Sequence, residues 1–361
     1  MSVTRAQLRR SIGVRTRQPF FERYNSGYLT ASSVGPTSLV DQDNLKQEDD
    51  FWNGQYLYLP GYDISRVISD FVSSTGTLSF REPISGNITD KSYEIWGQFS
   101  AHDVNAAINQ AIRDSWPFFF DSVREYIVIK YGTNSKLSLS KTARFIYRVA
   151  VENAALEHGT VTSTPSRQDY LVDLSKSFDS SYIGKEVRIH NGTSAGDRRV
   201  ITEVINSSTV KVASAFTSTL DTTSEYAIAP SAAEDSDYDI VFAWDIQSAS
   251  NSNAVEFLTS LEYHYGLTAR VDYEMEFQPL SSDTDTTDCP FEYIELAAIA
   301  RLYLIRLASA PRSEMDTWIG LQRAYSDAAR AYAQTYAYRH NAGVIAMWGT
   351  SGLLPEPFRE D

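Results

Sequence analysis

The sequence has almost no cysteine, and this scarcity limits the chemistry open to the protein. Cys289 is the single cysteine among 361 residues, so neither an internal disulfide nor a cysteine-based zinc site is expected, and an intracellular origin is favoured. The histidines stand singly, without the spacing that places two metal ligands on one helix face, at His102, His158, His190, His264 and His340. No metal and no cofactor are therefore expected.

Long apolar runs are also missing. The richest apolar segment, 296–307, is interrupted by Arg301 and Arg306, and the N-terminus lacks the apolar stretch of a signal peptide. The sequence therefore predicts a soluble protein that has no membrane segment and is not exported.

Signatures of catalysis are equally scarce. The chain contains no Gly-x-Ser-x-Gly, Gly-x-Gly-x-x-Gly or Walker-type lysine loop. Asp235, Asp237 and Asp239 alternate like the start of a calcium loop, but isoleucines occupy the positions that need glycine and glutamate. No histidine or asparagine motif marks Cys289 as a nucleophile. The protein is not expected to be an enzyme, although 46 acidic residues leave carboxylate pairs for a wall hydrolase as a third-ranked alternative.

Charge is distributed unevenly along the chain. A net charge of −14 disfavours a protein that coats nucleic acid by neutralising phosphates. The first 24 residues are the exception, with six arginines and one glutamate, and 4–12 has the spacing of a short amphipathic helix ended by Gly13. We predict a basic arm that docks on a partner through Arg5, Arg9 and Arg10.

An internal duplication organises the middle of the chain. Five short blocks recur in the same order, at an offset that runs only from 130 to 133 residues. The first copy contains 51–54, 56–59, 66–70, 77–80 and 93–95, and the second contains 182–184, 186–189, 199–203, 209–212 and 226–228. The blocks alternate or are β-branched, and turn-forming residues separate them, as in short antiparallel strands. Each copy is predicted to be a small β-barrel or sandwich.

The segments between and after the copies have other patterns. Ser100 begins a capping-box pattern, and apolar residues from Val104 to Trp116 mark one face of a helix that Pro117 stops. An additional antiparallel sheet is expected from the strand-like segments 126–131, 144–151, 238–244, 254–261 and 269–277.

The last part of the chain indicates an αα-hairpin. Its first helix is expected to follow an Asp288 cap with Pro290 in the first turn, and to end at Pro311. Its second helix is expected to run from a Ser313 cap to Gly343.

Aromatic residues are in excess, with 22 Tyr, 17 Phe and 6 Trp, and tyrosine is favoured at protein interfaces. On the last helix, Trp318, Tyr325, Tyr332 and Tyr336 recur at helical spacing, and we predict that they form a subunit interface. The tail beyond residue 342 is apolar without being regular. We predict that it is an arm that docks on a neighbouring protein through Val344, Ile345, Met347, Trp348, Leu353, Leu354 and Phe358.

Several stretches together resemble the head-to-tail adaptor, or connector, proteins of tailed bacteriophages. They are Leu8-Arg9-Arg10, Thr37-Ser38-Leu39-Val40-Asp41, Asp50-Phe51-Trp52-Asn53-Gly54, the segment from Val104 to Pro117, and the segment from Leu280 to Tyr293. They cover most of the chain in the right order. The second β-copy and the long segment between the copies depart from the compact adaptors, so the added β-module has no role assigned by the resemblance.

The resemblance implies a ring, expected to be a dodecamer, that docks beneath the portal protein in the virion neck. The basic and apolar arms are then candidates for portal docking, and tail, nozzle or stopper proteins are the partners on the other side. The protein would assemble in the host bacterial cytoplasm. An acidic wall would let genomic DNA pass without adhering.

The expected fold is α+β, with an antiparallel helical bundle of N-terminal, central and C-terminal helices, two duplicated small β-barrel or sandwich modules, and an additional antiparallel sheet. The expected segments are a basic N-terminal helix and arm (1–24), β-module copy 1 (25–99), a central bundle helix (100–120), a strand segment (121–157), β-module copy 2 (158–230), antiparallel strands (231–280), a helical hairpin completing the bundle (281–342) and a C-terminal arm (343–361).

The alternative from a different class is a phage tail or virion surface protein whose β-modules bind carbohydrate or a host receptor. Aromatic platforms from Trp52, Tyr56, Tyr58 and Trp96 would favour it. Their alternation, typical of strand residues that face a core, weighs against it.

Overall fold

A computed structural model describes residues 2–17, 29–31, 33–84, 92–116, 118–132, 136–154, 156–230, 238–240, 244–246, 254–257 and 264–348. The chain divides into two compact units, one formed by Met1–Asp121 with Glu276–Asp361 and the other by Ser122–Met275. Helices and antiparallel sheets both occur, which confirms the α+β class. Within the described ranges, no helix has the length and apolar character needed to cross a bilayer.

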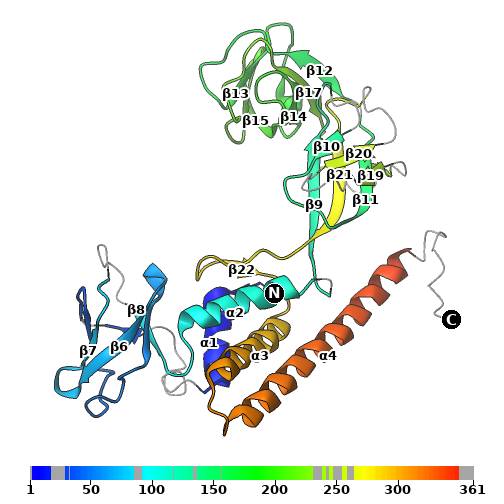
Figure 1. Ribbon diagram of the computed structural model, residues 1–361. Helices are drawn as coiled ribbons and strands as arrows, with labels where there is room; N and C mark the ends of the chain where they lie inside the picture. Colours follow the sequence, from blue (N-terminus) through cyan, green and yellow to red (C-terminus); the bar gives the residue numbers. More distant parts are fainter. Residues whose placement is uncertain are drawn as a thin grey trace, which may run out of the picture. The chain divides into compact units, whose positions relative to one another are not determined.

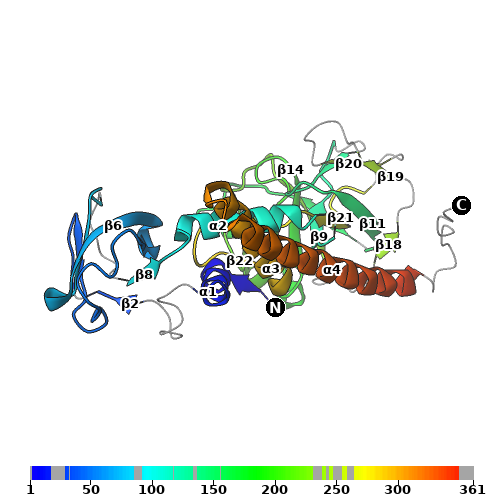
Figure 2. The same ribbon diagram turned by 60° about the horizontal axis from the view of Figure 1, so that its bottom comes forward.

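The first unit holds the four α-helices of the described chain. They are α1 (Arg5–Arg15), α2 (Ala101–Asp114), α3 (Phe291–Ser309) and α4 (Met315–Trp348). Figures 1 and 2 show α1, α2 and α3 lying together, with α4 running back along α3. At about 1.5 Å per residue, α4 is roughly 50 Å long and α3 less than 30 Å, so α4 continues well past its partner. A two-stranded ladder of β1 (Val3–Thr4) and β22 (Thr286–Thr287) ties the N-terminus to the segment before α3.

Local sequence explains where two of these helices begin. The Thr4 hydroxyl accepts a hydrogen bond from the Gln7 amide, and the Gln7 side chain accepts one from the Thr4 amide, which closes a capping box at α1. Ser100 and Asp103 make the same reciprocal pair at α2, as the sequence pattern predicts.

Three expected helix ends are wrong. Gly13 lies inside α1, because the helix continues to Arg15. Gly343 lies inside α4, which continues to Trp348. A single glycine costs a helix interior only about 1 kcal/mol, so packing overrides it. Pro290 is the N-cap of α3 and makes no side-chain capping bond, so Asp288 does not cap that helix.

One core joins the helices of the first unit. Leu8 and Ile12 of α1, Val104 and Ile108 of α2, and Leu302 of α3 are all buried in it. Trp318, Leu321, Tyr325 and Tyr332 of α4 pack against this core while partly exposed. α4 therefore covers one side of the other three helices.

A first β-module completes the first unit. Its strands are β2 (Leu29–Thr30), β3 (Ser33–Val34), β4 (Ser38–Val40), β5 (Tyr56–Leu59), β6 (Ile64–Val72), β7 (Thr77–Phe80) and β8 (Ser92–Trp96), in the spatial order β2-β8-β5-β6-β7-β4-β3. Neighbouring strands pair antiparallel, and the module has its own core around Leu57, Phe71 and Leu78.

The second unit contains a second β-module with the corresponding order. Its strands are β12 (Glu157–Thr160), β13 (Tyr170–Val172), β14 (Glu186–Asn191), β15 (Arg198–Asn206), β16 (Thr209–Val212) and β17 (Glu225–Ala229), arranged β12-β17-β14-β15-β16-β13. Replacing each strand by its counterpart turns the first order into the second, apart from the extra edge strand β3. Four of the five recurring blocks fall on strands, on β5 and β14, β6 and β15, β7 and β16, and β8 and β17. The first block, 51–54 and 182–184, lies in turns before β5 and β14 and forms no strand.

The two modules also share hydrogen bonds at corresponding positions. The Tyr93 hydroxyl donates to Asp41 at 2.7 Å, and the Tyr226 hydroxyl donates to Asp173 at 2.6 Å. Both long central strands contain a β-bulge, directly after Ile68 in β6 and directly after Ile201 in β15.

Two further sheets lie in the second unit. One has the order β18-β11-β21-β9, formed by β18 (Tyr238–Ile240), β11 (Phe145–Glu152), β21 (Thr268–Met275) and β9 (Asp121–Val128). The other is β10-β20-β19, formed by β10 (Lys136–Ser138), β20 (Ala254–Phe257) and β19 (Trp244–Ile246). Strands in these regions match the expected additional antiparallel strands.

Candidate functional site

A buried ionic junction joins α1 to the first β-module and to the segment before α3. The Arg9 side chain is fully buried and donates two hydrogen bonds to Glu94 of β8, at 3.0 and 2.9 Å. It donates two more to Asp283, at 2.7 and 2.6 Å, and one to Asn105 of α2, at 3.1 Å. The Tyr58 ring lies 4.6 Å below the guanidinium. One side chain therefore holds three segments that are far apart in the sequence.

Carboxylate groups balance the positive charge of the arginine in this junction. Burial alone would lower the pKa of Arg9, but the charge of Glu94 and the hydrogen bonds to Asp283 and Glu94 raise that pKa well above its usual value. Burial raises the pKa of Tyr58 strongly, although the Arg9 charge opposes this shift. Arg9 therefore stays positively charged in this buried cluster across the ordinary pH range.

Arg5 takes part in the same cluster. It is 4% exposed and pairs with Asp283 at 2.9 Å and with Asp63 at 3.3 Å. The prediction that Arg5 and Arg9 dock on a partner does not fit this structure, because ion pairs within the chain occupy both guanidinium groups. Arg10 is half-buried and remains a candidate for docking.

The aromatic residues of α4 mainly contact their own subunit. The Tyr303 ring of α3 lies 5.6 Å from the Trp318 ring and 5.6 Å from the Tyr325 ring, measured between ring centroids. Phe119 lies 5.1 Å from Tyr336 in the same sense. Trp318, Tyr325 and Tyr332 are partly buried in the core of the helices, while Tyr336 is 42% exposed. A role between subunits stays a prediction for the part of each ring that solvent still reaches.

The outer surface of the hairpin carries large exposed apolar side chains that the sequence analysis missed. Leu304 and Ile305 near the end of α3 are 47% and 46% exposed, and Met315 at the start of α4 is 37% exposed. All three lie at the same end of the hairpin, around the α3–α4 turn. Helical periodicity could not identify them, because it assigns apolar residues to the core.

The C-terminal docking candidates lie outside the part that can be described. Val344, Ile345, Met347 and Trp348 fall on the backbone of α4, but their side chains are outside the described set. Leu353, Leu354 and Phe358 lie outside the described residues altogether. The prediction that this arm docks on a neighbour therefore stays a prediction.

The second β-module is attached by the face that corresponds to the one used in the first. In the first module, Tyr58 and Trp96 point away from the module's own core and into the core of the helices. When the recurring blocks 56–59 and 186–189 are aligned, Arg188 of the second module stands at the position of Tyr58 in the first. Its guanidinium is 1% exposed and bonds to both carboxylate oxygens of Glu152 on β11, one of them at 3.0 Å, and to Glu186 at 2.8 Å.

This second junction is also charged and dry. The Thr268 amide donates to Glu152 at 3.1 Å, which adds a backbone contact from β21. Burial would lower the pKa of Arg188, but the bonds and charges of Glu152 and Glu186 raise it above its usual value. Across the contact the charges are reversed relative to the first junction, since Arg188 belongs to the module and Glu152 to the supporting sheet. Glu186, which also bonds to Arg188, belongs to the module.

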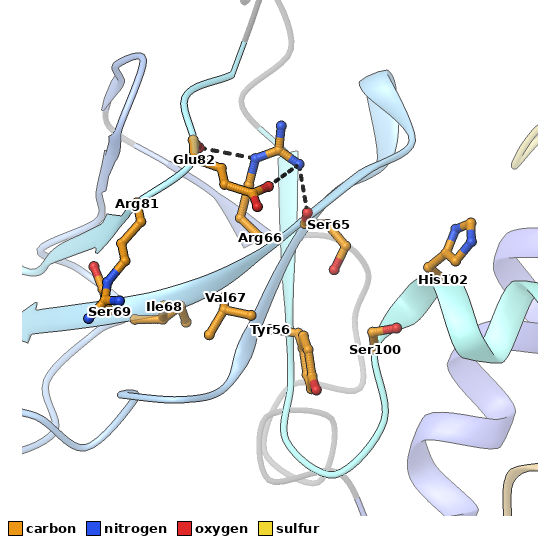
Figure 3. A pocket seen from close by; sticks show the side chains of 10 residues that line it. All are labelled: Tyr56, Ser65, Arg66, Val67, Ile68, Ser69, Arg81, Glu82, Ser100 and His102. Atoms are coloured by element: carbon orange, nitrogen blue, oxygen red, sulfur yellow. Dashed lines mark hydrogen bonds and ion pairs between the residues drawn. The ribbon is translucent and has the colours of Figure 1, made fainter. Parts of the chain in front are cut away.

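A solvent-open groove of about 770 Å³ lies on β6 of the first module, next to the start of α2. Figure 3 shows Tyr56 and Val67 along it and His102 at its α2 end. The Arg66 guanidinium is held by the backbone carbonyls of Ser65, Glu82 and Pro83 at 2.9–3.1 Å. Because Arg66 is used in this way and Arg81 and Glu82 are exposed, the groove has no buried charged group aimed at a ligand.

The described residues show little chemistry suited to catalysis. Cys289 is 1% exposed, and burial raises the pKa of its thiol to about 12, so it is a poor nucleophile at neutral pH. Among the described side chains, no group of three or more His, Cys, Asp or Glu could hold a metal ion. The alternating acids Asp235 and Asp237 lie outside the described residues.

The aromatic platforms proposed for carbohydrate binding are mostly internal. Trp52, Tyr58 and Trp96 are at most 2% exposed, and only Tyr56 reaches a surface, in the groove of Figure 3.

Comparisons with protein-family models, with curated proteins and with solved structures found no match.

Proposed function

We propose that the protein is a head-to-tail adaptor of a tailed bacteriophage. In this proposal it forms a ring, a dodecamer, between the portal protein and tail, nozzle or stopper proteins, and the ring continues the channel through which DNA leaves the head. It works without catalysis and is located in the neck of the virion. Its finer architecture is a helical bundle that carries two duplicated β-modules.

The observation that carries the proposal is the convergence of the adaptor-like stretches. Leu8 and Arg9, the segment from Val104 to Pro117, and the segment from Leu280 to Tyr293 are far apart in the chain. Leu8, Val104 and Tyr293 nevertheless lie in one core, and Arg9 bonds to Asn105 and Asp283 from the other two stretches. Residues that resemble one family thus depend on one another physically, which supports reading them as one unit.

The proposed duplication is supported by the strand orders of the modules. Two sheets with corresponding orders, bulges at Ile68 and Ile201, and matching Tyr–Asp bonds are hard to reconcile with independent origins. Both modules carry an exposed valine at the same position, Val67 and Val200, beside an arginine that is bonded to backbone carbonyls.

Ring formation requires exposed surfaces that a second copy can cover. Leu304, Ile305 and Met315 provide an apolar patch at the end of the helical hairpin, and heterologous contacts close into rings when the rotation permits. The net charge of −14 suits a channel wall past which DNA moves without adhering. Contact with DNA is therefore limited to passage, and no membrane contact is proposed.

The test is the mass of the purified full-length protein, alone and mixed with portal rings, with averaged electron micrographs of the assemblies. We expect a closed ring, or a monomer that becomes a ring on the portal. Ile305→Asp should prevent the ring without unfolding the chain, since Ile305 is 46% exposed, whereas Val67→Asp, at a site 53% exposed on the β-module, should leave it intact. A stable monomer or trimer that does not bind the portal would refute the proposal.

A further inference from the structure

The second β-module contacts its supporting sheet through two loops as well as through Arg188. One loop follows β9, where the Tyr131 amide donates to the carbonyl of His190 on β14 at 2.8 Å. The other precedes β21 and contains Tyr265 and Gly266. A β-carbon on Gly266, whose φ is +86°, would lie 2.7 Å from the Ala227 β-carbon, so loop and module are in close contact.

Two histidines face each other at this contact. The His158 Nδ1 on β12 lies 3.4 Å from the His190 Nε2 on β14, and His190 is 3% exposed. The Tyr265 ring lies against both imidazoles, at centroid distances of 5.6 Å from His158 and 5.3 Å from His190, and 5.6 Å from the Tyr131 ring. His158, unlike His190, is exposed. One imidazole can donate to the other only while at least one of them is neutral.

Protonating both rings would place two positive charges side by side, one on the buried His190 and one on the exposed His158. With both imidazoles charged, all their nitrogens become donors, so the contact at 3.4 Å loses its acceptor and becomes repulsive. Burial of His190 limits the water that can screen its charge, while the exposed His158 is solvated.

The charged groups around the pair act in both directions. Burial, followed by the charge of Lys176, lowers the pKa of His158, and Glu225 of β17 partly offsets this. Burial, followed by His158, lowers the pKa of His190, while Glu225 and the Tyr226 backbone oppose it. Other ionisable side chains on these elements are Glu157 beside His158, Lys130 beside Tyr131, and His264 beside Tyr265. The net effect favours neutral imidazoles in the docked arrangement.

We propose that protonation of His158 and His190 releases the second β-module from the loops at Tyr131 and Tyr265, which makes its docking on the sheet pH-dependent. The proposal does not depend on the adaptor function, because it concerns contacts within the second unit alone.

The direction follows from proton linkage. Both pKa values are depressed in the docked state, so docking is unaffected well above the ordinary histidine pKa of about 6.5 and weakens as the pH falls below it. If neither docked ring binds a proton, two free rings would weaken docking by up to several hundred-fold between pH 7 and pH 5. Partial protonation in the docked state would reduce this factor.

The experiment is hydrogen exchange of the full chain at pH 7.5 and pH 5, read by mass spectrometry and corrected for the intrinsic exchange rate. The reporter is the peptide containing the Tyr131 amide, which bonds across the contact. We expect its protection to fall steeply at pH 5, while peptides from β5 and β6 of the first module stay protected. Unchanged protection of Tyr131 in the wild type would overturn the proposal.

Variants separate the pair from a general acid effect. The double variant His158→Gln, His190→Gln should lose the pH response, and His102→Gln, which changes a histidine outside this contact, should retain it. A pH response that persists in the double variant would also overturn the proposal. Should the double variant not fold, NMR titration of the wild-type imidazoles decides, because a pKa at or above 6.5 for both rings contradicts the mechanism.

Discussion

Replacing Arg9 with methionine should cost the first unit about 3 kcal/mol of unfolding free energy. The substitution keeps an unbranched apolar stem but removes the guanidinium and its hydrogen bonds to Glu94, Asn105 and Asp283. Breaking a buried ion pair by removing one partner costs about 3–5 kcal/mol, because the remaining charge stays buried. The lower end applies here, since Trp96 still donates to Glu94 and Arg5 still pairs with Asp283.

The assay is urea unfolding followed by tryptophan fluorescence. Trp244 is the only tryptophan in the segment Ser122–Met275, so the signal reports chiefly on the first unit. Arg10→Met is the matched control, because Arg10 is on the same helix and is only half-buried. We expect the control to change stability by less than about 1 kcal/mol.

A double variant sharpens the test. Arg9→Met combined with Glu94→Leu removes both charges, so its cost should be at least about 1 kcal/mol less than the sum of the two single costs. Equal costs for Arg9→Met and Arg10→Met, or strict additivity with Glu94→Leu, would show that the junction does not hold the module as described.

Three further predictions follow from the geometry. Tyr226→Phe and Tyr93→Phe should each lower the free energy of unfolding by about 1–3 kcal/mol, because each leaves a buried aspartate without its phenol donor. Thermal unfolding should show comparable losses in the two units. A loss in only one unit would contradict the equivalence of the modules. Gly192→Ala should destabilise far more than Gly184→Ala in a thermal shift assay, because a β-carbon at Gly192 would lie 2.0 Å from a backbone oxygen while Gly184 has open space; equal shifts would refute this. Deleting residues 343–361 should abolish cosedimentation with portal rings while circular dichroism stays native, and intact portal binding would remove the C-terminal arm from the proposal.

Local patterns identified the elements of the fold well. The Ser100 capping box and the apolar face from Val104 onward predict α2, whose first residue follows the cap directly. Alternating blocks of four or five residues predict the central strands of both modules, because side chains in a strand alternate with a period of two residues. These features depend on residues that are close together in the chain, so the sequence alone reveals them.

Contacts between distant segments escaped the same reasoning. The arginines of α1 have the composition of a free basic arm, and nothing near them in the chain shows that Glu94 and Asp283 will surround Arg9. Asp283 is 274 residues away, in the segment that precedes the helical hairpin. Pairing His158 with His190 required the strand order β12-β17-β14, which no spacing rule supplies.

Exposed apolar residues were missed for a related reason. A helical pattern assigns Leu302 and Ile305 to the same core face, yet Leu302 is fully buried and Ile305 is 46% exposed. The difference arises because the core of the helices ends before the last turn of α3. How far a core extends depends on the lengths of neighbouring helices, which are set by tertiary packing.

The opposite charges of the two junctions make each β-module fit only its own place. If the modules exchanged positions while the chain folds, the carboxylate of Glu94 would meet that of Glu152, and the guanidinium of Arg188 would meet that of Arg9. Like charges forced together without water are strongly unfavourable, so the exchanged form is rejected. The charges that meet across each contact, Arg9 with Glu94 in the first junction and Arg188 with Glu152 in the second, therefore favour each module's own place.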